Sequence, residues 1–113
     1  MDLASKLQLK PGQRLRSLDV PDDLALDIGT SADPADGLLV FVRSADDYRA
    51  RRSEIVRSAI ADRLTWVAYP KAGRLGTDLN RDRLAAILGD DGVTPVRQIA
   101  IDDTWSALRI RPA

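Results

Sequence analysis

Hydrophobic positions along the chain form two short, nearly continuous runs with one helical stripe between them. "LLVFVR" (38–43) and "LTWVAY" (64–69) contain almost no polar residue, which is typical of strands buried on both faces of a sheet. Between them, apolar side chains recur at helical spacing up to about Asp62, and Ser44 suits the N-cap with Asp47 three residues on. The stripe that faces the core is expected to comprise Tyr48, Ile55, Val56, Ala59 and Ile60. The pattern predicts a βαβ unit, in which one amphipathic helix joins two parallel strands.

Weaker patterns predict the segments before this unit. Asp2 suits the cap of a short helix within residues 2–9, and "KPG" then interrupts the chain. Alternation over 14–20 predicts a strand that ends at Pro21. Residues 24–29 are interpreted as a weaker second strand or a short helix with an extended exit, and residues 30–37 as a loop.

The segments after the unit predict one more helix and a hairpin. Asn80 suits the N-cap, Leu79 can pack on Leu84 as a hydrophobic staple, and Gly89 suits the C-terminal cap. The last two apolar stretches are expected to pair antiparallel through a turn at Asp102 to Thr104; they are "VRQIAID" (96–102) and "WSALRIR" (105–111). We therefore predict a single α/β domain over 1–113. It has a small mixed sheet with a βαβ core, flanking helices and a C-terminal antiparallel hairpin.

The connection "PKAGRLGTD" (70–78) is the main candidate site, because ligands of open α/β sheets bind beyond the carboxyl ends of the parallel strands. The candidate anion-binding residues are Lys71, Gly73, Arg74, Gly76, Thr77 and Asp78. Cationic side chains and glycine amides at a helix start can cradle an anion. The preferred interpretation is a tight strand-to-helix connection, in which Lys71 and Arg74 are solvated and a local side-chain cap accounts for Thr77 and Asp78. Alternatively, Asp78 holds Lys71 or Arg74, or acts as a carboxylate base. The anion site is a further alternative.

Other conspicuous side chains favour structural roles. Trp66 and Trp105 could line a pocket, but large aromatic residues in a small domain usually belong to the core. Asp102 and Asp103 are expected to shape a turn rather than bind a metal. The arginines of the first long helix are expected to form a solvated face; they are Arg49, Arg51, Arg52 and Arg57.

Composition excludes several chemistries. The chain has no histidine and no cysteine, which rules out Ser-His-Asp and Cys-His catalysis within it and removes the commonest metal ligands. We expect no catalytic residue, no metal and no cofactor. The 17 basic residues balance the 17 acidic ones, which argues against nucleic-acid binding. No apolar run reaches the ~20 residues of a membrane span, and the start of the chain lacks a signal-peptide pattern, so a cytoplasmic location is expected.

The stretches "WVAYPK", "TDLNRD" and "DDTWSALRIR", with "LQLKPGQRL" near the start, resemble an uncharacterised bacterial family common in actinobacteria. That family shares a W-x-x-x-P-K step, a T-D-L helix entry and a D-x-T-W-S-x-L ending. It is a domain of unknown function, so the resemblance implies no activity.

The layout also resembles a reduced, Rossmann-like class I methyltransferase, whose sheet likewise ends in a helix and an antiparallel hairpin. The turn after the first strand departs from that pattern. "SLDVPDDLAL" (17–26) has no glycine to admit a ligand close to the backbone, and Pro21 adds bulk.

The function expected from the sequence is therefore a non-catalytic binding or interaction domain, for a small anionic ligand or a protein partner. A degenerate methyltransferase-like or carboxylate-based enzyme is the alternative. A homodimer formed through the edge of the last hairpin is a further candidate.

Overall fold

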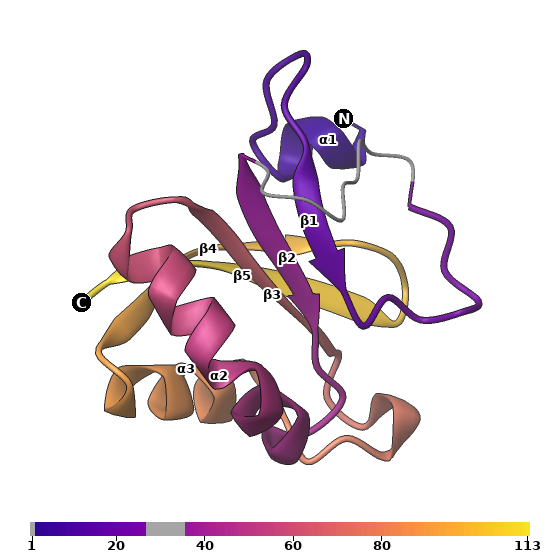
Figure 1. Cartoon of the computed structure of the whole chain (residues 1–113). Coiled ribbons are helices and arrows are strands. Elements are labelled where there is room, and N and C mark those ends of the chain that lie inside the picture. The colour runs from indigo at the N-terminus through magenta and orange to yellow at the C-terminus, as the bar shows by residue number, and fades with distance from the viewer. Residues whose placement is uncertain (1, 27–35) are drawn as a thin grey trace.

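A computed structural model describes residues 2–26 and 36–113 of the chain (Figure 1). In chain order the elements are α1 (Leu3–Lys6), β1 (Leu15–Leu18), β2 (Gly37–Phe41), α2 (Ala45–Ile60), β3 (Leu64–Pro70), the 3-10 turn η1 (Arg74–Gly76), α3 (Arg81–Asp90), β4 (Val93–Ala100) and β5 (Trp105–Pro112). The strands form one sheet in the order β1-β2-β3-β5-β4. β1, β2 and β3 are parallel, whereas β5 is antiparallel to both β3 and β4. The predicted fold class is therefore confirmed: an α/β mixed sheet with a βαβ core and a C-terminal hairpin.

The two faces of the sheet are covered differently (Figure 1). Helices α2 and α3 pack on one face, where Val40, Val67 and Leu108 belong to a cluster of buried side chains. The other face carries a second cluster, which includes Trp66 and Leu39 together with Leu7 from the segment after α1. Because both faces are covered, β2 and β3 are buried along almost their whole length. This double burial explains why their sequences are continuously apolar.

The predicted helix starts are confirmed by their side-chain caps. The Ser44 hydroxyl accepts a hydrogen bond from the Asp47 amide at 3.1 Å, and the Asn80 side chain accepts one from the Arg83 amide at 2.8 Å. Asp2 caps α1 in the same way. Such caps satisfy amides that the first helical turn leaves without partners.

Two predicted details of the helices are wrong. Ile60 is 56% exposed, because α2 ends there and the chain turns toward β3. Gly89 is not the cap of α3: the helix continues to Asp90, and Gly92 adopts the left-handed conformation with φ of 83°. The residue with a positive φ is the one that requires glycine.

The predicted strand over 24–29 is wrong in its described part, residues 24–26, and its remainder lies outside the described residues. The amide of Leu24 donates to the carbonyl oxygen of Pro21, which makes a turn instead of a ladder. Leu24 and Leu26 still pack against the second cluster, together with Val20. Their side chains are apolar because they pack over one face of the sheet, although these residues form no strand of it.

β4 begins at Val93, three residues earlier than expected. Its pairing with β5 continues through a register shift between Pro95 and Arg97, so the proline does not end the strand. β4 is also the outer edge of the sheet. A proline, an irregular register and a charged side chain all hinder strand addition at an edge.

At Gly37 the backbones of β2 and β3 approach each other too closely to admit a side chain. A Cβ atom added at Gly37 would lie 2.3 Å from the backbone oxygen of Leu64, whereas one added at Gly89 in α3 would meet nothing within 4 Å. We predict that Gly37→Ala lowers the free energy of unfolding by about 2–3 kcal/mol or more. Gly89→Ala, the matched control, should raise it by up to about 1 kcal/mol. Urea denaturation measures both, and equal effects of the two substitutions would contradict the close approach.

Candidate functional site

The parallel strands β1, β2 and β3 all end at the same edge of the sheet, to the right of helices α2 and α3 in Figure 1. Ligands of open α/β sheets bind outside such an edge. The segments that follow the three strands there begin at Asp19, Val42 and Lys71. These three segments therefore form the candidate site.

The connection from β3 to α3 is a hydrogen-bonded turn. The Lys71 amide donates to the carbonyl oxygen of Thr104 at 2.8 Å, which ties the end of β3 to the β4–β5 turn. The amides of Arg74 and Thr77 donate to the carbonyl oxygens of Lys71 and Arg74, and Gly73 and Gly76 both have positive φ. Three amides of the predicted anion cradle, those of Lys71, Arg74 and Thr77, are thus occupied by the chain itself. The geometry matches the preferred interpretation, a tight connection.

Thr77 and Asp78 join this connection to the start of α2. The Thr77 hydroxyl donates to the carbonyl oxygen of Arg43 at 2.7 Å and accepts from the Leu79 amide at 3.0 Å. Asp78 accepts from the Ala45 amide at 3.0 Å. Its second oxygen lies 3.6 Å from the Arg83 guanidinium, so it holds neither of the two cations expected. Both side chains are structural ties between helix starts.

Trp66 and Trp105 belong to the same buried cluster, as the preferred interpretation expected. The Trp66 indole N–H donates to the carbonyl oxygen of Leu7 at 3.1 Å, which fixes the segment after α1 on the sheet. Trp105 packs edge-on against Phe41, with ring centroids 5.1 Å apart. Trp66 is fully buried, whereas Trp105 also lines a cavity at the carboxyl edge.

That cavity is open to solvent, has a volume of about 320 Å³ and is lined by four segments distant in sequence. They are the turn after β1, the end of β2, η1, and the β4–β5 turn. Its charged residues are Arg43, Asp22, Asp23 and Asp102. Its apolar residues are Leu24, Leu75 and Trp105. A concave site with apolar walls and a few convergent polar groups is the usual form of a small-molecule site.

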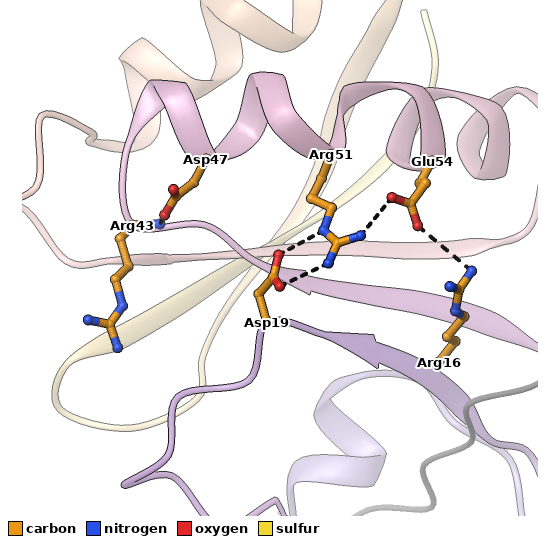
Figure 2. A network of polar contacts seen from close by, with 6 residues as sticks. All are labelled: Arg16, Asp19, Arg43, Asp47, Arg51 and Glu54. Atoms are coloured by element: carbon orange, nitrogen blue, oxygen red, sulfur yellow. Dashed lines mark hydrogen bonds and ion pairs between the residues drawn. The ribbon is translucent and has the colours of Figure 1, made fainter.

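Arg43 is the cation of this cavity. Its backbone is held firmly, because its amide donates to Asp47 at 2.9 Å and its carbonyl oxygen accepts from Thr77. Its guanidinium points away from Asp47 in Figure 2 and has no ion-pair or hydrogen-bond partner within residues 2–26 and 36–113. The same holds in this part of the chain for the side chains of Lys71 and Arg74 nearby. The carboxyl edge therefore presents cations that the described fold does not use.

Neighbouring arginines form ion pairs that hold parts of the fold together. Arg51 makes a two-pronged ion pair with Asp19 at 2.8 and 3.0 Å and reaches Glu54 at 2.9 Å, and Arg16 lies 3.7 Å from Glu54 (Figure 2). Arg52 contacts Asp91 at 2.8 Å. The sequence predicted that the arginines of α2 form a solvated face. The structure shows that this face is only partly solvated. Two of these arginines bind α2 to the turns after β1 and α3.

Asp19 carries both a backbone and an electrostatic constraint. Its φ is 59°, in the left-handed region that few residues other than glycine, asparagine and aspartate adopt. The hydrogen bonds from Arg51 lower the pKa of the Asp19 carboxyl below its usual value. The start of the turn after β1 is therefore fixed on α2 by a charged contact.

Sequence reasoning missed Arg43 and Leu75 as site residues. Arg43 had a usable signal, because it is the first charged residue after a buried parallel strand. Leu75 had none: only the fold places it beside Trp105.

The Asp19–Arg51 pair predicts a pH-dependent contribution to stability. Because the pKa of Asp19 is lowered on folding, the contribution is fully present above the unfolded pKa of about 3.9 and is lost as the pH falls through the folded value. The two side chains are 47% and 31% exposed, so solvent screening limits it to about 1 kcal/mol or less. Asp19→Asn, which tolerates the same φ, should lower stability at pH 7, and this deficit should shrink as the pH falls below about 3.9.

Urea denaturation at stepped pH measures this difference. Asp103→Asn, which removes an exposed carboxylate without an ion-pair partner in the described residues, is the control and should show no such step. If the deficit of Asp19→Asn did not shrink as the pH falls below about 3.9, the effect of the substitution would not arise from the charge of Asp19.

Within residues 2–26 and 36–113, no three acidic, histidine or cysteine groups gather as a metal site would require. No helix in this part combines the length and apolar character needed to cross a membrane. Comparison of the chain with protein-family models, curated proteins and solved structures finds no match. Function must therefore be argued from the geometry of the carboxyl edge.

Proposed function

We propose that this protein is a non-catalytic binding domain that takes a small ligand with an anionic group at the carboxyl edge of its parallel strands. The observation that carries the proposal is the Arg43 guanidinium, which lines a cavity of about 320 Å³ without a partner in the described chain. An arginine fork recognises carboxylate and phosphate groups by paired hydrogen bonds. Apolar walls formed by Leu24, Leu75 and Trp105 would hold an aliphatic part of the same molecule.

The residues around Arg43 support binding rather than catalysis. The chain supplies no histidine or cysteine as a base or nucleophile near neutral pH. The carboxylates of Asp19 and Asp78, which lie at the same edge, are engaged by Arg51 and by the Ala45 amide. Asp22 and Asp23 of the cavity are exposed to water, and burial does not prepare them as a general base. Arg43 itself is preorganised through its backbone, which reduces the entropy lost on binding.

A second candidate is a reduced methyltransferase-like protein. It is supported by the element order, in which a parallel sheet is followed by α3 and the antiparallel pair β4–β5. The turn after β1 weighs against it, because Asp19 is fixed by Arg51 and Pro21 is buried where backbone would need to approach a nucleotide-like ligand.

We also propose membership of the uncharacterised bacterial family that the motifs resemble. Support comes from the roles of the motif residues in the fold. Trp66 holds the segment after α1, Thr77 and Asp78 join two helix starts, and Asp102 accepts hydrogen bonds from the Thr104 and Trp105 amides in the last turn.

The anion proposal predicts that 4-methylpentanoate binds more tightly than acetate, because each buried methylene contributes about 0.8 kcal/mol. Arg43→Ala should weaken its binding about tenfold or more, since a hydrogen bond to a charged group contributes roughly 1.5–3 kcal/mol. NMR titration of the labelled protein at low ionic strength measures both. Arg49→Ala is the matched control, because Arg49 pairs with Asp46 on the exposed side of α2. Equal affinities for the wild type and Arg43→Ala would contradict the proposal.

The methyltransferase-like candidate predicts saturable binding of S-adenosylmethionine. Isothermal titration calorimetry on the intact chain measures it. We expect no saturable heat, because the start of the turn after β1 is fixed on α2. Saturable binding would favour this candidate over the anion proposal.

A further inference from the structure

The cavity at the carboxyl edge contains more negative than positive charge. Asp22, Asp23 and Asp102 lie around it, whereas Arg43 is its single cationic side chain among the described residues. Asp22 and Asp23 are exposed and make no ion pair within the described ranges. A ligand with only an anionic group would meet these carboxylates unfavourably. A ligand that also carries a cationic group would satisfy both signs of charge.

The apolar part of the cavity includes a strained residue. Leu75 has φ of 54° and is 55% exposed. Among the described residues, three others that are not glycine have positive φ, and the side chain of each accepts a hydrogen bond from an arginine: Gln8 from Arg109, Asp19 from Arg51, and Asp62 from Arg111.

Leu75 has no polar side chain with which to offset its strain in this way. Its exposed aliphatic surface instead lies in the cavity wall, with the half-buried Leu24 and the edge of Trp105. Strained residues of this kind concentrate at ligand-contacting positions. The wall formed by Leu24, Leu75 and Trp105 is therefore well placed to contact an aliphatic group.

Resting on the proposed function, we propose that the ligand is a small zwitterion with an aliphatic side chain, as in an α-amino acid or a short peptide. Arg43 binds the carboxylate, the carboxylates of Asp22, Asp23 and Asp102 attract the ammonium, and Leu24, Leu75 and Trp105 contact the aliphatic group. A cavity of about 320 Å³ lies at the small end of ligand sites, which run from roughly 300 to 1,000 Å³. This volume favours a metabolite of few atoms over a nucleotide.

Three probes that share one carbon skeleton test the inference. Leucine carries both charged groups, 4-methylpentanoate has the carboxylate alone, and 3-methylbutylamine has the ammonium alone. NMR titration of the full chain at low ionic strength should show leucine binding about tenfold more tightly than either of the others. Two further probes distinguish a free amino acid from a short peptide as the ligand. Leucylleucine has a free carboxylate, whereas leucylleucine amide has none.

Substitutions test which residues contact the ammonium and the aliphatic group of the ligand. The double substitution Asp22→Asn with Asp23→Asn should remove the advantage of leucine over 4-methylpentanoate, and Asp46→Asn, an exposed carboxylate on α2 outside the cavity, should not. Leu75→Gly, which relieves the backbone strain, should weaken leucine several-fold while leaving the protein folded. Heteronuclear spectra of each variant verify the fold.

The outcomes separate the two proposals. If 4-methylpentanoate binds through Arg43 and leucine binds no more tightly, the anion site stands and the zwitterion inference is wrong. If none of the probes binds, or if binding is indifferent to Arg43→Ala, both are wrong. Tighter binding of leucine that depends on Arg43 and on the Asp22–Asp23 pair supports both.

Discussion

Burial of β3 on both faces is the constraint on which the rest of the structure depends. Trp66 and Ala68 face one cluster, whereas Val67 and Tyr69 face the other. A strand removed from water on both faces needs its backbone groups paired along both edges, here by β2 and β5. The helix layer, the layer formed by the segment after α1, and the position of the carboxyl edge all follow from covering this strand.

The parts of the fold that sequence reasoning predicted are those set by local physics. Continuous apolar runs identified β2 and β3, and Ser44 and Asn80 marked helix starts because a cap acts within a few residues. The errors fall where a distant partner decides the outcome. Leu24 was assigned to a strand because an apolar residue that covers a sheet has the same local pattern as one within it.

The site was predictable only in its location. A rule about parallel strands indicated the edge on which the candidate site is placed. The roles of Thr77 and Asp78 depend on partners just before and at the start of α2, 34 and 33 residues away. No spacing rule anticipates such a contact. The cavity is harder still, because four segments contribute to it and Leu75 is exposed in a conformation that its neighbours Gly73 and Gly76 help to produce.

The position of β5 has a consequence for how the chain folds. β5 lies between β3 and β4, although it is the last strand made. During synthesis the free edge of β3 therefore stays open until residues 105–112 leave the ribosome and insert beside it. Such non-local pairing slows folding and exposes an apolar strand to other nascent chains in the meantime.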